Sequence, residues 1–306
     1  MKIIEENAEE WKQGTTIDEI WNHVARCARV CYQTQAKENE NGKEFINRVI
    51  LRGNSYSLIA KNPILKTKLH LSVLEHGTIY LIIAPDDVNY LEISTFYAHN
   101  IFSKVLYTID VCFITTNLRV LIENGRMSDL KYISNPRHYH AKRTTICIIS
   151  PIGGIRDTNR HRAHSISEES TRFCRYTSPK FGEGLTFVNL PWIDRNNIDM
   201  HIPNELYVHE DEAISEHITK WWDDLDWYFY CLEVIEVTYK KLISLGWTAQ
   251  QASNVLPFAT KTQSIHTAFD CDWEHYVALR SDEVSGPVRP EVKIIADKIK
   301  EIINNK

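Results

Sequence analysis

A densely charged segment, residues 160–175, sets the first limit on how this chain folds. It mixes guanidinium, imidazole, hydroxyl and carboxylate groups where a buried core would require apolar side chains. From residue 156 to residue 175 there are five arginines and three acids, a local charge of +2 in a chain whose formal net charge is -5. Because guanidinium groups grip phosphate bidentately, the segment predicts a site for an anionic ligand. A solvated loop whose charges pair with acidic neighbours is the alternative.

The rest of the chain has the composition of an ordinary globular protein. Its 306 residues, 43% of them hydrophobic, can bury a substantial core, and we expect a single domain over 1–306 because no repeat or linker interrupts it. The mild net charge argues against a nucleic-acid binder and favours small anionic ligands. No apolar run reaches the roughly 18 to 20 residues of a membrane span, and the N-terminus lacks a secretory signal, so we expect a cytoplasmic protein with no membrane partner.

The seven cysteines predict reduced thiols. Their number is odd, they are scattered, and no C-x-x-C pair occurs, so neither a disulfide framework nor a structural zinc site is expected. His138 and His140 lie two residues apart, but no carboxylate or cysteine nearby completes a set of metal ligands. We therefore expect no metal site.

Hydrophobic periodicity predicts an α/β (α+β) fold with one mixed central sheet flanked by helices. Thr16 and Glu19 form a capping-box pattern that predicts a helix at about 17–33. Further helices are expected near 45–52, at 117–124, from 153 onward, at 212–245, 271–280 and 290–304. β-branched and aromatic runs predict strands at 78–83, 110–116 and 144–149, which could pair in that sheet.

The longest predicted helix, 212–245, lies in the second half of the chain. Its aromatic stripe is expected to face the core or a subunit interface, and Gly246 is expected to end it. Asp223, Asp224 and Asp226 are expected on its solvated face.

Five motifs, in order along the chain, resemble those of the flavin-dependent thymidylate synthases. The most specific is Arg160-His161-Arg162 followed by seven residues and Ser170, which resembles the signature of that family. The other motifs are ARVCY at 28–32, LSVLEHGT at 71–78, VLP at 255–257 and DWEHYVALR at 272–280. These motifs span most of the chain, and 54–69 and 83–109 look like insertions relative to the family.

The resemblance implies a reaction and an assembly. It implies that dUMP becomes dTMP, with 5,10-methylenetetrahydrofolate as carbon donor and with FAD that is reduced by NADPH. It also implies a homotetramer whose sites form between subunits. Cysteine-dependent thymidylate synthases carry a Pro-Cys-His run, which is absent here, and no residue is marked as a protein nucleophile.

The resemblance further assigns residues to the flavin. The positions that match flavin-contacting ones are His76, Thr78, Arg160, His161, Arg162, Glu168 and His275. A single histidine is more often a core or surface residue, but three histidines at matching motifs favour binding.

A second group of residues is assigned to the nucleotide. Arg280 matches the arginine that faces the uracil, where its permanent charge would stabilise negative charge developing on the ring. An arginine that neutralises the macrodipole at a helix end is the alternative. Ser170 and Arg172 match positions that hold the nucleotide and its phosphate, and Asp157 occupies another nucleotide-contacting position.

Four positions depart from the family pattern. Asp157 stands where glutamine is usual and Ser253 where many members have arginine, while Phe269 and Ser167 replace amide side chains. A carboxylate near a phosphate is unfavourable, and the loss of an arginine removes a contact worth roughly 1.5 to 3 kcal/mol. Two alternative functions follow: a same-scaffold enzyme that hydroxymethylates C5 or takes another pyrimidine nucleotide, and a non-catalytic flavin- or nucleotide-binding relative.

Overall fold

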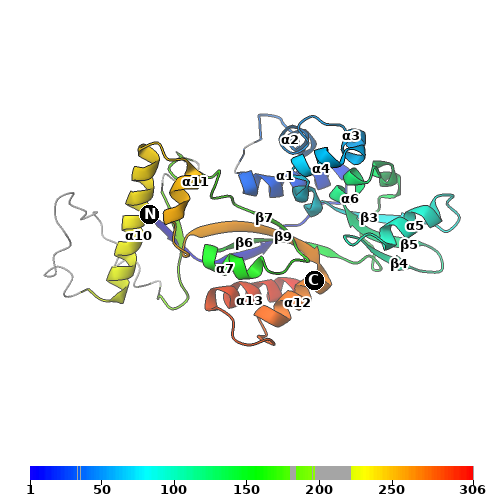
Figure 1. Cartoon of the computed structure of the whole chain (residues 1–306). Coiled ribbons are helices and arrows are strands. Elements are labelled where there is room, and N and C mark those ends of the chain that lie inside the picture. Colours follow the sequence, from blue (N-terminus) through cyan, green and yellow to red (C-terminus); the bar gives the residue numbers. More distant parts are fainter. Residues whose placement is uncertain (33, 35, 180–183, 195, 197–221, 306) are drawn as a thin grey trace.

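The chain folds into several sheets surrounded by helices, which confirms the predicted mixed α/β class. A computed structural model describes residues 1–32, 34, 36–179, 184–194, 196 and 222–305 (Figure 1). The strands are β1 (Lys2–Ile4), β2 (Asn7–Glu10), β3 (Thr78–Ile83), β4 (Lys104–Tyr107), β5 (Cys112–Asn117), β6 (Arg143–Pro151), β7 (Ser165–Glu168), β8 (Thr186–Val188) and β9 (Lys261–Phe269).

Helices of very different lengths connect these strands. The α-helices are α1 (Ile17–Tyr32), α2 (Gly42–Val49), α3 (Tyr56–Lys61), α4 (Pro63–Lys68), α5 (Tyr90–Ala98), α6 (Leu118–Glu123), α7 (Ile152–Thr158), α10 (Asp224–Ser244), α11 (Ala249–Ala252), α12 (Asp270–Arg280) and α13 (Pro290–Asn304). Three short 3₁₀ helices are η1 (Leu71–His76), η2 (Met127–Tyr132) and η4 (Ser253–Val255). None of the helices in the described ranges combines the length and the apolar character that a bilayer crossing requires.

A four-stranded antiparallel sheet lies at the centre, in the order β2-β6-β9-β7. The pairing of β6 with β9 is the longest and runs from Arg143 opposite Phe269 to Pro151 opposite Lys261. Alternate side chains of β6 face opposite layers, because successive side chains of a strand point to opposite faces. Ile146 and Ile148 pack in the cluster that includes α12 and α13, while Cys147 packs with α1 residues (Figure 1).

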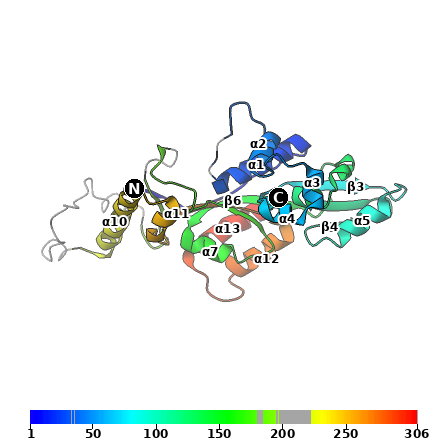
Figure 2. The same cartoon turned by 45° about the horizontal axis from the view of Figure 1, so that its top comes forward.

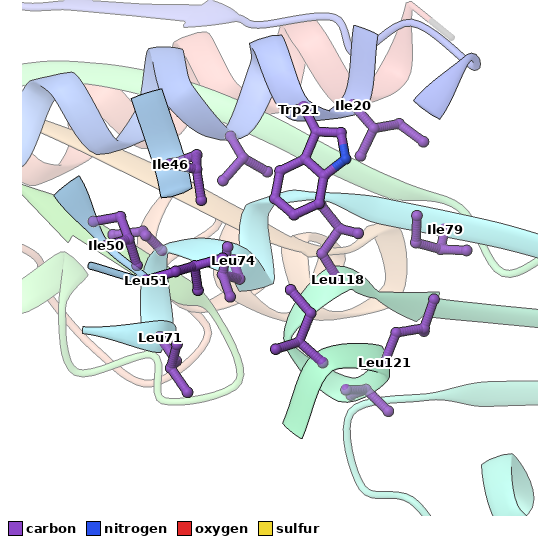
Figure 3. Packing of buried hydrophobic residues seen from close by; sticks show 14 of the residues in the cluster. Ile20, Trp21, Ile46, Ile50, Leu51, Leu71, Leu74, Ile79, Leu118 and Leu121 are labelled. Atoms are coloured by element: carbon purple, nitrogen blue, oxygen red, sulfur yellow. The ribbon is translucent and has the colours of Figure 1, made fainter. Parts of the chain in front are cut away.

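A second sheet, β3-β5-β4, holds the largest hydrophobic core. β3 pairs antiparallel with β5 from Thr78 opposite Asn117 to Ile83 opposite Cys112. Its apolar side chains pack under α1, α2, η1 and α6, with Trp21 at the centre (Figure 3). The prediction that 78–83, 110–116 and 144–149 share one sheet is therefore wrong, since the third run is β6 of the central sheet. The central sheet is also antiparallel throughout, and the parallel pair β1-β8 forms a separate two-stranded sheet next to it.

Several predicted helices are present at or near their expected bounds. The capping box of α1 forms, with the Thr16 backbone N–H donating to Glu19 Oε2 (2.9 Å) and the Glu19 N–H donating to Thr16 Oγ1 (3.3 Å). The two segments expected as insertions fold as α3 and α4 and as α5 and β4. α5 and β4 lie at the end of the molecule opposite α10 (Figures 1 and 2).

The long helix of the second half begins at Asp224, and residues 212–221 of its predicted range lie outside the described residues. Asp223 and Asp224 are exposed and Asp226 is half-buried, as expected for a solvated face. Asp223 and Asp226 also form a capping box: the Asp226 N–H donates to Asp223 Oδ1 (2.9 Å) and the Asp223 N–H donates to Asp226 Oδ2 (3.0 Å). Leu232 and Tyr239 of the aromatic stripe are buried, and Gly246 ends the helix with a φ of +93° that favours glycine.

Candidate functional site

A pocket of about 360 Å³ lies between the turn at residues 160–164 and helix α12. Five residues expected at the flavin or the nucleotide line it together: Arg160, His161, Arg162, His275 and Arg280. The structure therefore brings two of the sequence motifs, more than 100 residues apart, to one place.

Strand β9 explains why these two segments meet. β7 begins directly after the turn, with Ser165 opposite Thr267 of β9, and α12 begins where β9 ends at Phe269. Both segments therefore emerge at the same end of β9. Trp273 fixes the helix on the sheet, since its side chain is fully buried and its Nε1–H donates to the Thr144 carbonyl (3.1 Å).

Arg280 and His161 are in direct contact in this pocket. The Arg280 Nε–H donates to His161 Nε2 at 3.2 Å, so this ring nitrogen acts as an acceptor and the imidazole is neutral. Burial and the charge of Arg280 lower the pKa of His161 to about 4, which agrees with this assignment. The His161 ring also meets the Tyr276 ring edge-on, with centroids 4.7 Å apart. His161 thus fixes Nε of the guanidinium and leaves its other N–H groups available to a ligand.

A buried histidine pair lies behind His161. His164 Nδ1 and His266 Nδ1 are 3.3 Å apart, so one ring donates an N–H to the other. Burial lowers the pKa of His164 to about 4 and that of His266 well below its usual value. His164 also packs on Trp273, with centroids 4.3 Å apart. The floor of the pocket is therefore neutral and rigidly packed.

The pocket as a whole is cationic. Arg160, Arg162 and Arg280 contribute three positive charges and Asp272 one negative charge, a balance of +2. Arg160 and Arg162 are exposed, and neither forms an ion pair with any carboxylate in the part of the chain that the structure describes. Guanidinium groups without a carboxylate partner can take an anionic ligand without losing an internal ion pair.

His76 and Thr78 lie elsewhere, between the second sheet and the central one. His76 is fully buried, with Nδ1 2.7 Å from Thr267 Oγ1 and Nε2 2.8 Å from Ser167 Oγ. Both ring nitrogens are thus occupied, and burial lowers the pKa of this histidine to about 3. Thr78 is also buried and accepts a hydrogen bond from Arg143 Nη1 (3.2 Å). Neither residue lines the pocket of Arg280, and their flavin role stays a prediction.

Glu168 lies at the C-terminal end of β7, and its carboxylate is bound by two other side chains of the protein. Its Oε2 accepts from Asn159 Nδ2 (2.8 Å) and its Oε1 from Thr262 Oγ1 (3.1 Å). Burial raises the pKa of this carboxyl. Asn159 precedes the Arg-His-Arg triplet directly, so Glu168 positions the turn from which the pocket arginines project.

The residues expected at the nucleotide form a separate group beyond β7. The Ser170 N–H donates to the Cys31 carbonyl at the end of α1 (3.3 Å), and Arg172 Nε donates to Gln250 Oε1 (3.3 Å). Ser253 shares that glutamine, since its Oγ donates to the Gln250 carbonyl (2.9 Å). Ser253, which stands where many family members have arginine, and Arg172 therefore contact the same glutamine, one through its backbone carbonyl and the other through its side chain.

Asp157 contributes backbone contacts near the pocket. It lies in the last turn of α7, half-buried, and its carbonyl accepts the Arg160 N–H (3.3 Å). Its side chain does not line the pocket of Arg280.

Three residues of this site were not anticipated from the sequence. His164 and Asp272 line the pocket, and His266 supports it from β9. His164 lies within the charged segment 160–175, and this position could have identified it as a candidate pocket residue. His266 could not, because the strand that carries it was not recognised.

His140, outside the pocket, has a structural role. His140 is buried, with Nδ1 accepting the Arg137 N–H (2.9 Å) and Nε2 3.1 Å from the Leu81 carbonyl. All seven cysteines carry free thiols. No cluster of three or more potential metal ligands occurs among residues with a described position.

Comparison with known proteins adds a family match. The family model Thy1, described as thymidylate synthase complementing protein, matches residues 140–306. This segment contains the Arg280 pocket, whereas His76 and Thr78 precede it. No curated protein matches the chain.

Solved structures similar to this chain include a UMP/dUMP methylase, PolB from Streptomyces cacaoi, in two complexes. The complex with 5-Br dUMP is 14% identical, with 100% of this chain and 93% of that chain covered and a TM-score of 0.43. The complex with 5-Br UMP is 18% identical, with 61% and 74% covered and a TM-score of 0.36.

Proposed function

The chain belongs to the thymidylate synthase complementing protein family, and we propose from this that it methylates C5 of the uracil ring of dUMP. In this proposal 5,10-methylenetetrahydrofolate donates the carbon, NADPH supplies the electrons, and FAD is the cofactor. The motif resemblance and the cationic pocket that two of these motifs build support the proposal.

The residues of the pocket fit an anionic cofactor and substrate. Arg160, Arg162 and Arg280 outnumber the single carboxylate of Asp272, and His161 and His275 add polar ring edges. When bound, the flavin would supply the reducing equivalents for the methyl group. Arg160, His161, Arg162 and His275 would hold it, through charge-assisted hydrogen bonds and ring contacts.

Arg280 would act on the pyrimidine. With Nε bound to His161, the remaining guanidinium N–H groups can donate to the oxygen atoms of a uracil ring. A fixed positive charge there stabilises negative charge that develops on the ring when C5 becomes nucleophilic. The neutral state of His161 matters because a protonated imidazole would lose this hydrogen bond and repel Arg280.

The residues that bind the nucleotide phosphate would come from a second copy of the chain. Ser170 and Arg172 are expected to hold the phosphate, yet they do not line the pocket of Arg280 within one chain. We propose that a homotetramer brings Arg172 of one subunit to the Arg280 pocket of another.

The contact between Arg280 and His161 in a cationic pocket is the observation that carries this proposal, and a pair of measurements tests it. The purified protein should show flavin absorption bands that change when dUMP is added. It should also release tritium from C5-labelled dUMP in the presence of NADPH and methylenetetrahydrofolate. A protein without bound flavin that fails to turn over after FAD is supplied would contradict the proposal.

A second candidate function is an enzyme that takes another pyrimidine nucleotide or forms a hydroxymethyl product. The surroundings of Arg172 favour it. Ser253 shares Gln250 with Arg172, so the expected phosphate cradle has a neutral hydroxyl where many family members place a cation. Mass spectrometry of the products from dUMP, UMP and dCMP would distinguish the candidates. A methyl gain on dUMP alone supports the first, and a hydroxymethyl gain or preference for another nucleotide supports the second.

A further inference from the structure

Cys271 lies in the first turn of α12, with its side chain exposed and its sulfur in contact with an amine. Lys104, the first residue of β4, places its Nζ 2.6 Å from Cys271 Sγ. N–H···O hydrogen bonds seldom fall below about 2.7 Å and sulfur is larger than oxygen, so the two atoms are closer than in an ordinary hydrogen bond. A nucleophilic nitrogen and an oxidisable sulfur, from residues 167 positions apart, therefore meet at an exposed point of the molecule.

A neighbouring aromatic ring holds the lysine in this position. The Lys104 ammonium lies over the Phe269 ring, 4.4 Å from its centroid, a distance at which a cation and a ring attract each other. Phe269 ends β9 and directly precedes α12, so its ring keeps the lysine beside the first turn of that helix. Among the residues placed by the structure, no carboxylate forms an ion pair with Lys104. The amine is therefore held at the sulfur and is not drawn away by an acid.

The other cysteines lack this arrangement. Four are buried and Cys31 is half-buried. Burial raises the pKa of the Cys112 thiol to about 11, which disfavours the thiolate that oxidants attack. Cys231 on α10 is exposed like Cys271, but no lysine hydrogen-bonds to it in the described part of the chain. Cys231 thus serves as a control for exposure alone.

We propose that Cys271 and Lys104 form a reversible covalent S–N link when a peroxide oxidises the cysteine. The Cys271 thiolate attacks one oxygen of hydrogen peroxide, so that an S–O bond forms, the O–O bond breaks and hydroxide leaves. Sulfur is oxidised by two electrons to a sulfenic acid, and the peroxide is reduced. The Lys104 amine, once its ammonium proton has passed to water, then attacks the sulfur, and the S–O bond breaks with loss of water. In sum, the protein loses two hydrogen atoms and one peroxide becomes two water molecules.

The link joins two separate parts of the fold. β4 belongs to the sheet β3-β5-β4, whereas α12 packs on the central sheet and carries His275 and Arg280. Neither Lys104 nor Cys271 lines the Arg280 pocket, so the link acts on the start of the pocket helix and not on a ligand. A crosslink between distant positions restricts the unfolded chain and so stabilises the folded one. The contact is therefore a redox-sensitive clamp that a thiol reductant opens.

Mass spectrometry of the full chain tests this link. The reduced protein is treated with hydrogen peroxide, and its intact mass and tryptic peptides are compared before and after addition of dithiothreitol. We expect a peptide that contains Lys104 joined to one that contains Cys271, lighter than their sum by two hydrogen atoms and separated by dithiothreitol. The oxidised protein should also unfold at a higher urea concentration than the reduced protein.

Three variants then locate the link. Lys104→Arg keeps the positive charge but has no amine that can be deprotonated, so Cys271 should gain oxygen and remain unlinked. Lys142→Arg changes another exposed lysine, next to β6, and is the matched control in which the link should form as in wild type. Cys231→Ser should likewise leave the link unchanged.

Either of two results would overturn the proposal. The first is peroxide-treated wild type in which Cys271 carries only added oxygen while Lys104 is unmodified. The second is a Cys271 link that forms to the same extent in Lys104→Arg as in Lys142→Arg. Neither measurement uses turnover or flavin, so the outcome is independent of the proposed methylation.

Discussion

Four histidines of this chain are buried and form hydrogen bonds within the protein. His76, His161, His164 and His266 are buried, and their hydrogen bonds run to hydroxyls, to each other or to Arg280. Desolvation disfavours the protonated ring and lowers the pKa in each case. At the scale of the residue, the pocket is therefore built on neutral imidazoles, one of which accepts a hydrogen bond from the permanently charged Arg280.

The first prediction concerns Arg280. Arg280→Ala should lower kcat for tritium release from dUMP by about 100-fold or more, because a fixed charge on the developing anion is lost. Arg280→Lys should retain part of the activity, since it keeps the charge but loses the Nε–H that His161 accepts. Arg137→Ala, an exposed arginine outside the pocket, is the control. Wild-type turnover by Arg280→Ala would remove this residue from the chemistry.

The second prediction concerns pH. The pKa of His76 is about 3 in the folded state and about 6.5 when exposed, so the unfolded chain binds more protons between these values. Stability contributed by the neutral ring is thus complete above pH 6.5 and is lost as pH falls towards 3. Urea denaturation should show a free energy of unfolding that declines from pH 7 to pH 5. In His76→Gln the total decline from pH 7 to pH 5 should be smaller by roughly 2 kcal/mol; identical declines in both proteins would contradict this.

At the scale of the element, sequence reasoning succeeded where apolar periodicity is clear. The helix from Ile17 was predicted with its capping box, and β3 was predicted at its bounds, because β-branched and helical patterns differ in period. Strand β9 was missed for a physical reason. Thr262, Ser264, His266 and Thr267 are buried polar residues, so this inner strand lacks the hydrophobic signal of a core strand.

The third prediction belongs to helix α12, which carries His275 and Arg280. Trp273→Ala should cost about 3 to 5 kcal/mol, because it empties the space between the helix and the central sheet. Trp273→Phe should cost less, chiefly the hydrogen bond to the Thr144 carbonyl. Urea denaturation measures both, with the exposed Trp192→Ala expected within about 0.5 kcal/mol of wild type. Equal costs for Trp273→Ala and Trp192→Ala would show that α12 does not depend on this anchor.

At the scale of the whole molecule, motif resemblance anticipated contacts that periodicity could not. The meeting of the Arg-His-Arg triplet with Arg280 depends on the register of β7 and β9, and neither strand was predicted. His76 shows the opposite case, because its motif match does not reveal that both ring nitrogens are bound in the core. The sequence therefore indicated which residues line the pocket better than it indicated the framework that holds them.

The last prediction tests whether the site is completed by a second subunit. Arg172 and Arg280 belong to separate groups within one chain, yet both are proposed to act on one nucleotide. Arg172→Ala and Arg280→Ala should each be nearly inactive alone. When the two chains are co-expressed, a site between subunits takes an intact Arg280 from one chain and an intact Arg172 from the other. Random mixing would restore about a quarter of the sites.

The control for this complementation is the double variant Arg172→Ala/Arg280→Ala mixed with either single variant, which can form no intact site in any arrangement. Light scattering of the mixed sample should give the mass of a tetramer, so that recovered activity can be attributed to mixed assemblies. A site contained in one chain predicts no recovery at all, because every chain in the mixture lacks one of its two arginines. Recovered turnover thus separates a shared site from a self-contained one, whatever the pyrimidine substrate is.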